Sequence, residues 1–192
     1  MRIRYTATLI LLSLLPWTAS VSWTQVPPDS VSKGKRTVLD KYLLAVQAYE
    51  KWKANQQGIK ILDVRTLGEY VYVGHAPMAC HIPFKRLSDR WDPARGGYSM
   101  PLNPGFAEAV KELFSPADTV MVMCRSGGRS AAAVNLMAGE GFRNVYNIID
   151  GFEGDKVTDP DSYFLGKRVK NGWKNSGAPW TYDLDPKLVY KK

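Results

Sequence analysis

The chain alternates between short apolar runs and longer stretches with helical spacing. Apolar runs with few polar interruptions occupy residues 59–64, 79–82, 120–123 and 144–149. Such runs are typical of strands buried on both faces of a parallel sheet, because an alternating pattern would be expected if one face met water. Strands alternating with helices therefore predict an α/β fold built on a parallel sheet.

Helices are predicted where apolar residues recur three or four positions apart. One helix begins near Thr37, a suitable N-cap, and is stopped by residues 55–58; its apolar face comprises Leu39, Tyr42, Leu43, Val46, Tyr49 and Trp52. A second helix covers 106–114, with Phe106, Val110, Leu113 and Phe114 directed inward. A third covers 129–140, and residues 69–73 form a single helical turn or an irregular connector.

The segment 85–104 is rich in glycine, proline, asparagine and aspartate. We expect a long loop with one helical turn, in which Trp91, Tyr98 and Met100 either anchor the loop to the domain or form the wall of a pocket. Farther along, the pairs Gly172-Trp173 and Pro179-Trp180 predict that the irregular C-terminal part folds back onto the domain.

The amino terminus has the pattern of a secretory signal peptide. Arg2 and Arg4 precede an apolar run over residues 5–17, and small residues follow it. The run falls short of the roughly 20 apolar residues that a membrane span needs, although an uncleaved anchor stays an alternative. We therefore predict a signal peptide over 1–22, export to the periplasm, no stable membrane span after processing, and an irregular leader over 23–36.

Charge adds little to the choice of function. The 192 residues carry a formal net charge of +8, which becomes +6 when the predicted signal peptide removes Arg2 and Arg4. An exported protein rarely meets nucleic acid, and the lysines are scattered, so no nucleic-acid partner is expected. A basic, solvated surface that attracts small anions is the better interpretation.

The candidate chemistry lies directly after the apolar run at 120–123. Cys124 would stand at the carboxyl end of a strand, where ligands bind in open α/β sheets. Gly127 and Gly128 allow successive backbone N–H groups to converge on one point, while Arg125 and Arg129 add positive charge. Such surroundings favour a thiolate, so Cys124 is predicted to be a nucleophile rather than a small buried apolar residue.

The second cysteine leaves two alternatives open. In an exported chain, Cys80 and Cys124 could form a disulfide, if they lie at the ends of neighbouring strands. Cys80 could also resolve an oxidised or persulfide form of Cys124, which Cα atoms more than about 7 Å apart would exclude. A metal site formed by His75, Cys80 and His81 is not expected, because strand neighbours point to opposite faces.

Five motifs, in order along the chain, resemble those of single-domain rhodanese-like sulfurtransferases. They are Leu62-Asp63-Val64-Arg65, Glu69-Tyr70, Gly74-His75-Ala76-Pro77-Met78-Ala79-Cys80-His81-Ile82-Pro83, Cys124-Arg125-Ser126-Gly127-Gly128-Arg129-Ser130, and Gly151-Phe152-Glu153-Gly154 with Gly172-Trp173. The resemblance spans residues 37–180 and leaves 181–192 as a C-terminal tail. It implies a rhodanese-like α/β fold with a central, mostly parallel five-stranded sheet flanked by helices.

The sequence departs from the family pattern at four positions and by one insert. Ala76, Met78, Cys80 and His81 replace an isoleucine, a glycine, an aliphatic residue and an asparagine that the family usually carries. The glycine-to-methionine change puts the local turn geometry in question. An insert also separates Gly154 from Gly172.

The resemblance implies a persulfide cycle without a cofactor or metal. Cys124 would take the sulfane sulfur of a small sulfur-containing anion such as thiosulfate and pass it to a thiol, to a cyanide-like acceptor or to a protein. The substrate would be bound by the loop that follows, namely Arg125, Ser126, Gly127, Gly128, Arg129 and Ser130. Asp63 and Arg65 would support the site as an ion pair.

Two further functions compete with sulfur transfer. Phosphatases space the cysteine and arginine by five residues, whereas four residues separate Cys124 from Arg129, so a phosphatase or arsenate reductase is a poor second. The other is non-catalytic: a sulfur carrier or partner-binding module that docks through the 85–104 segment and the basic surface.

Overall fold

The structure is a computed structural model that describes residues 25–94 and 96–191. The predicted signal peptide lies outside the described residues. Within them, no helix is both long enough and apolar enough to cross a membrane.

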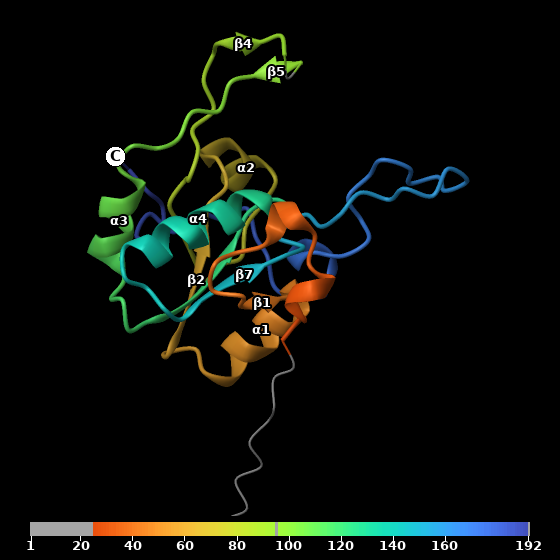
Figure 1. The fold of residues 1–192 in the computed structure, drawn as a ribbon. Helices are drawn as coiled ribbons and strands as arrows, with labels where there is room; N and C mark the ends of the chain where they lie inside the picture. The colour runs from red at the N-terminus through yellow and green to blue at the C-terminus, as the bar shows by residue number, and fades with distance from the viewer. Residues whose placement is uncertain (1–24, 95, 192) are drawn as a thin grey trace, which may run out of the picture.

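A five-stranded parallel sheet forms the centre of the molecule, as predicted (Figure 1). The strand order is β1-β7-β6-β2-β3, with hydrogen-bonded neighbours parallel throughout. Their bounds are β1 Tyr42–Leu43, β2 Ile59–Asp63, β3 Ala79–His81, β6 Thr119–Met123 and β7 Val145–Ile148. The runs at 59–64, 79–82, 120–123 and 144–149 are therefore strands.

The two faces of the sheet carry two separate hydrophobic clusters, because successive side chains of a strand point to opposite sides. Val120 and Val122 pack with α3 (Phe106–Leu113) and α4 (Gly128–Gly139). Met121 and Met123 face the other cluster, which includes residues of α1 (Ala45–Ala54) and the 3-10 helix η3 (Trp173–Asn175). Apolar residues at consecutive strand positions thus fill two cores. The other helices are α2 (Leu67–Tyr72), η1 (Pro28–Ser30) and η2 (Lys33–Lys35).

The predicted helix from Thr37 is wrong in its first part. Tyr42 and Leu43 form strand β1, paired with Asn147 and Ile148 of β7, and α1 begins only at Ala45. The Ala45 N–H donates to the buried carboxylate of Asp150 at 2.8 Å, which fixes the start of the helix. Both residues of the strand are fully buried, so burial at the sheet edge prevails over helical spacing.

The predicted inward face of the helix at 106–114 is also wrong at one position. Phe106, Val110 and Phe114 are buried, but the side chain of Leu113 is 53% exposed. Leu113 is the last residue of α3, directly before the turn that leads into β6.

The 85–104 segment contains a hairpin instead of a helical turn. The short strands β4 (Trp91–Asp92) and β5 (Gly97–Tyr98) pair antiparallel, and the hairpin projects from the body of the molecule (Figure 1). The side chains of Trp91 and Tyr98 do not anchor the loop to the domain; they stack edge-to-face on each other, with ring centroids 5.6 Å apart. They are 56% and 55% exposed. We call residues 85–104 the arm.

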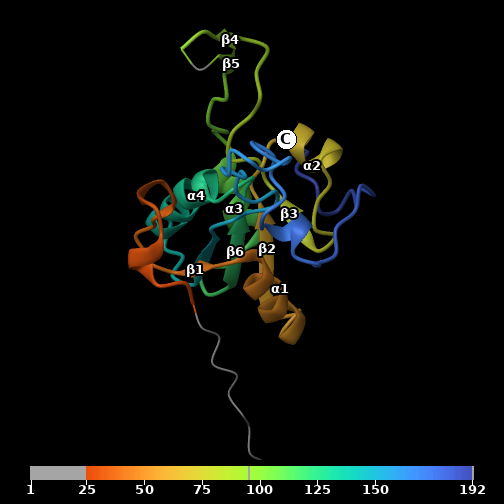
Figure 2. The same cartoon turned by 90° about the vertical axis from the view of Figure 1, so that its right-hand side faces the viewer.

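The C-terminal part folds back onto the domain, as expected. Trp173 is fully buried, and the following chain runs along the edge of the sheet beside β3 (Figure 2). There the His81 N–H donates to Leu188 O at 2.7 Å, and the Tyr190 N–H donates to His81 O at 3.1 Å. The tail therefore covers an edge strand that would otherwise expose its hydrogen-bonding groups.

Candidate active site

Cys124 follows β6 directly and lies at the carboxyl edge of the sheet. Its Sγ accepts a hydrogen bond from the Gly127 N–H at 3.2 Å, and the residue is 2% exposed. Gly127 has φ +95° and ends the loop as the N-cap of α4. A Cβ there would lie 2.2 Å from the carbonyl oxygen of Ile149, so only glycine fits.

A turn after β7 holds the outer side of the cysteine loop. The Phe152 N–H donates to Cys124 O at 2.8 Å, and the Glu153 N–H donates to Arg125 O at 3.0 Å. Gly151, with φ +63°, allows the close approach, since a Cβ there would lie 2.4 Å from Cys124 O. The carbonyl groups of the loop are thus bonded on one side, while an amide of the loop faces the sulfur on the other.

A buried polar network lies beneath the sulfur. Ser130 Oγ is 3.4 Å from Cys124 Sγ and 2.6 Å from Asn147 Oδ1, so its single hydroxyl proton can serve either contact. Asn147 Nδ2 donates to the carbonyl groups of Lys35, at 2.9 Å, and Gly127, at 3.1 Å. Asn147 therefore ties together η2, the cysteine loop and α4.

Arg129 is held by an ion pair across the site. Its two terminal nitrogens donate to the two carboxylate oxygens of Glu69, at 2.5 and 2.6 Å. The same carboxylate accepts from the Thr66 N–H and hydroxyl, which caps α2. Burial opposes the ionisation of Glu69, but the hydrogen bonds and charge of Arg129 outweigh it and lower the pKa of Glu69 to about 2.

Asp63 and Arg65 form a second ion pair, with both side chains fully buried. The Arg65 side chain donates three hydrogen bonds to the Asp63 carboxylate, the shortest at 2.6 Å. It also donates to Gly74 O at 2.8 Å, and its guanidinium stacks on the ring of Phe152, 4.0 Å from the centroid. Arg65 thereby joins the end of β2 to the turn that supports the cysteine loop.

A cavity of about 430 Å³ opens beside the cysteine loop. Arg125 and Arg129 line it from the loop and α4, and Lys85, Leu87 and Met100 line it from the arm. Glu69 and Thr66 complete its wall. The cavity combines three cations with one carboxylate, which favours a small anion.

The residues predicted to bind substrate fall into three groups. Arg125 and Arg129 reach the cavity, whereas Gly127 and Ser130 are buried next to the sulfur. Ser126 and Gly128 lie between them in the loop and are not among the residues that line the cavity.

Sequence reasoning missed two residues of the site. Asn147 lies in an apolar strand run and gave no chemical signal, although an asparagine in a buried strand is itself unusual. Lys85 follows the motif that ends at Pro83, and only the path of the arm brings it to the cavity.

Cys80 is excluded from both roles proposed for it. The two cysteines are free thiols, and β2 lies between β3 and β6, so their strands are not neighbours. At about 4.8 Å per strand spacing, β3 and β6 are about 10 Å apart, too far for a disulfide or for direct resolution. Burial also raises the pKa of the Cys80 thiol.

At Met78, where the family usually carries a glycine, the backbone is not strained. Among the described residues, Asp40 is the one non-glycine residue with positive φ, so Met78 has an ordinary backbone and packs against the core. His75 and His81 bond to backbone carbonyl groups. No group of three or more potential metal ligands occurs among the residues that the structure describes.

The parallel sheet, with a cysteine loop at its carboxyl edge, makes this an α/β protein with a candidate cysteine active site. Comparison with known proteins gives the family. The model of the rhodanese-like domain matches residues 46–157, more than half of the chain, so the protein belongs to the rhodanese-like family. This confirms the resemblance found in the sequence.

Two relatives and one solved structure show what this chain is similar to. Thiosulfate sulfurtransferase 16, chloroplastic, of Arabidopsis thaliana is 37% identical over 95 residues, which cover 50% of this chain and 72% of the relative. The putative sulfur carrier protein YrkF of Bacillus subtilis is 27% identical over 108 residues, which cover 56% of this chain and 47% of that protein. The crystal structure of Rv0390 from M. tuberculosis superposes with a TM-score of 0.59 at 24% identity, covering 74% and 98%.

Proposed function

We propose that the protein is a sulfurtransferase that carries a sulfane sulfur as a persulfide on Cys124. The observation that carries the proposal is the Gly127 N–H aimed at Cys124 Sγ, next to a cavity lined by Arg125 and Arg129. A backbone donor and nearby cations stabilise an anionic sulfur, which is the species that both halves of the cycle require.

The donor is a small sulfur-containing anion such as thiosulfate. Its sulfonate end binds in the cavity to Arg125 and Lys85, with Arg129 as a third cation whose charge Glu69 partly offsets. The outer sulfur of the donor then faces the cysteine loop. Arg129 therefore has two roles: it contributes positive charge to the cavity, and its ion pair with Glu69 fixes the cysteine loop to α2.

The first step transfers one sulfur atom. The Cys124 thiolate forms a bond to the outer sulfur of thiosulfate, and the bond from that sulfur to the sulfonate sulfur breaks. The electron pair leaves with sulfite, and the product is an anionic persulfide. An S–S bond of about 2.05 Å carries the reactive sulfur outward from the buried Sγ.

The second step restores the thiolate. A thiophilic acceptor, a thiolate or cyanide, bonds to the outer sulfur, and the electron pair of the broken S–S bond returns to Cys124. Each transfer moves one electron pair from the attacking anion to the leaving anion, with no net oxidation and no proton gained or lost, so neither step calls for a redox cofactor or a proton donor. Asp63 and Arg65 take no part in bond making and support the loop through Phe152.

Mass spectrometry of the mature protein after incubation with thiosulfate tests the proposal. The wild type should gain one sulfur atom, cyanide should remove it, and Cys124→Ser should gain none. Cys80→Ser is the matched control and should behave as the wild type, because Cys80 lies two strands away. If the reduced wild-type protein gains no sulfur, thiosulfate transfer is wrong.

A sulfur carrier is the second candidate, and the resemblance to a putative sulfur carrier favours it. A carrier would accept the sulfur atom on Cys124 as a persulfide, but it would release this sulfur only to a protein docked on the arm. Steady-state thiocyanate production from thiosulfate and cyanide separates the two, since a carrier loads once and an enzyme turns over.

Export to the periplasm is part of the same proposal and rests on the sequence of residues 1–22. Fractionation of cells that produce the full chain tests it. The protein should be found outside the cytoplasm, shortened by about two kilodaltons, the mass of some 20 residues.

A further inference from the structure

Asn147 has a fixed orientation beneath the cysteine loop. The residue is fully buried in β7, and its Nδ2 donates to Lys35 O at 2.9 Å and to Gly127 O at 3.1 Å. Both amide hydrogens are therefore used, and the reverse orientation would place the amide oxygen against two carbonyl oxygens. The side-chain oxygen Oδ1 consequently faces Ser130, 2.6 Å from its Oγ.

One of the two carbonyl groups that hold this amide comes from outside the matched family domain. Lys35 is the last residue of η2, and its side chain pairs with Asp155 Oδ1 at 2.8 Å. The family model matches residues 46–157, so η2 lies before the matched range. The segment that precedes the domain thus helps to set the position of Asn147.

The hydroxyl group of Ser130 has two acceptors within reach and only one hydrogen. An amide oxygen can only accept a hydrogen bond, so at the 2.6 Å contact Ser130 is the donor and Asn147 Oδ1 is the acceptor. While this bond is formed, Ser130 Oγ presents lone pairs alone to Cys124 Sγ, which is 3.4 Å away. A donor for the sulfur is therefore present but engaged elsewhere.

The charge on Cys124 Sγ differs between the two forms of the proposed cycle. In the thiolate the negative charge is on Sγ, which then attracts a hydrogen-bond donor more strongly than a neutral amide oxygen does. In the persulfide the charge is on the outer sulfur, and Sγ is an uncharged atom of an S–S bond. The stronger acceptor next to Ser130 is thus Sγ before loading and Asn147 Oδ1 after it.

We propose that Asn147 is a positioning residue, which accepts the hydrogen bond of Ser130 when Cys124 carries sulfur and gives it up when the thiolate returns. The hydrogen stays covalently bound to Ser130 Oγ throughout, and only its acceptor changes. Asn147 thereby stabilises the persulfide relative to the free thiolate, which makes Cys124 a better acceptor of sulfur. The inference rests on the proposed function, since it concerns the persulfide of Cys124.

Alkylation of Cys124 by iodoacetamide tests this role without sulfur transfer, because the thiolate is the reacting form. In Ser130→Ala the thiolate loses a donor, so the pH of half-maximal rate should rise by about one unit, the size of one charged hydrogen bond. In Asn147→Leu the hydroxyl is left with Sγ as its acceptor, so this pH should fall by about one unit. A purely structural role of Asn147 predicts the opposite sign, because a loosened loop withdraws the Gly127 N–H from the sulfur.

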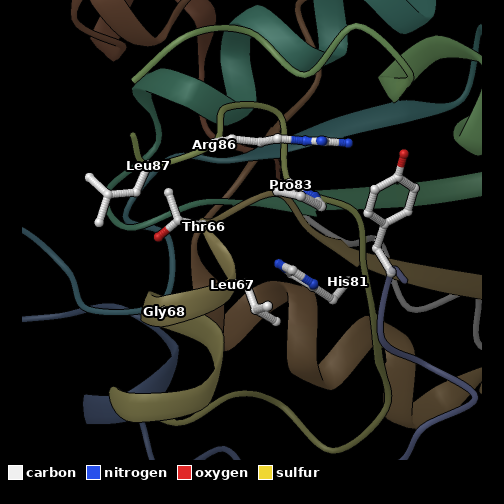
Figure 3. A pocket seen from close by; sticks show the side chains of 8 residues that line it. Thr66, Leu67, Gly68, His81, Pro83, Arg86 and Leu87 are labelled. Atoms are coloured by element: carbon white, nitrogen blue, oxygen red, sulfur yellow. The ribbon is translucent and has the colours of Figure 1, made fainter. Parts of the chain in front are cut away.

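Two further variants make the comparison specific. The double variant Ser130→Ala, Asn147→Leu should have the same half-maximal pH as Ser130→Ala, because Asn147 acts through the hydroxyl. Tyr190→Phe also removes one hydroxyl, but from the wall of a second cavity, of about 320 Å³, that none of these residues lines (Figure 3); it should react as the wild type. Arg125 and Arg129, the cations of the donor cavity, are unchanged in all of these proteins. A half-maximal pH in Asn147→Leu at or above that of the wild type would overturn the proposal.

The wild-type protein allows a measurement that does not depend on the folding of an Asn147 variant. The side-chain carbonyl carbon of Asn147 senses the hydrogen bond to Oδ1, so its carbon-13 signal should shift when Cys124 ionises and return when thiosulfate loads it. Ser130→Ala should show neither change. A signal that stays constant through ionisation and loading would contradict the proposal. A shift on ionisation without any persulfide would keep the role of Asn147 and reject sulfur transfer; a persulfide without a shift would do the reverse.

Discussion

Glu69 and Arg129 are 60 positions apart in the sequence and form a two-bond ion pair across the candidate active site. The pair fastens the first turn of α4, which carries the cysteine loop, to the first turn of α2. Both side chains are less than one-fifth exposed, so solvent screens the pair little.

Replacing Glu69 by glutamine should destabilise the protein in a pH-dependent way. The pKa of Glu69 is about 2 in the folded protein and about 4.3 in an unfolded chain. A depressed pKa stabilises the fold above the unfolded value, and the stabilisation is lost as the pH falls from about 4.5 to about 2. The free energy of unfolding of the wild type should exceed that of Glu69→Gln by about 3 kcal/mol at pH 7. This difference should shrink as the pH falls from about 4.5 to about 2.

Urea unfolding at pH 7, 4.5, 3 and 2 measures this difference, with Glu108→Gln as the control. Glu108 is exposed on α3, so its replacement should have little effect at any of these pH values. A difference between wild type and Glu69→Gln that does not change with pH would show that the ion pair is not its source.

The local patterns in the sequence were sufficient for four of the five strands of the sheet and for the cysteine loop. Four strands were predicted because a buried parallel strand needs a run of apolar residues in the chain itself, whatever it packs against. The loop after Cys124 was recognised because Gly127 and its neighbours carry the required backbone freedom locally. These features depend on adjacent residues.

The errors concern features that depend on distant residues. Tyr42 and Leu43 fit a helical pattern, and only their pairing with β7 shows that they form a strand. The hairpin of the arm depends on the contact between Trp91 and Tyr98, which no helix or loop signal reveals. Likewise, the Glu69-Tyr70 motif did not indicate that Glu69 pairs with Arg129, because the two residues are 60 positions apart in the sequence.

Gly127→Ala should abolish or strongly slow persulfide formation. The new Cβ would meet Ile149 O at 2.2 Å, and φ +95° is unfavourable for alanine, so the loop must move away from the sulfur. Gly139→Ala is the matched control in the same helix, since nothing lies within 4 Å of its Cβ and its φ is not positive. Comparison of thiosulfate loading rates checks the prediction, which is wrong if the two variants load alike.

Asn147→Asp should destabilise the protein by about 3 kcal/mol at pH 7. The Nδ2 of Asn147 donates to two carbonyl oxygens, and a carboxylate oxygen in its place would face both without a proton. Ser130 would keep its acceptor, so the loss arises on the side of Lys35 and Gly127. Thermal unfolding of the variant, alongside Asn135→Asp on the exposed side of α4, measures the effect; equal melting temperatures would contradict it.

Lys85→Met should raise the KM for thiosulfate about tenfold and change kcat by less than twofold. Lys85 lines the donor cavity from the arm, so its charge should stabilise the bound dianion and the transition state of the transfer equally. The effect should weaken as salt increases, because the contact is partly exposed. Lys60→Met is the control, since Lys60 lies near the amino end of β2, away from the carboxyl edge that holds Cys124. Steady-state kinetics with cyanide as the acceptor measures both variants. If Lys85→Met lowered kcat and left KM unchanged, Lys85 would act on the transfer step, and its assignment to donor binding would be wrong.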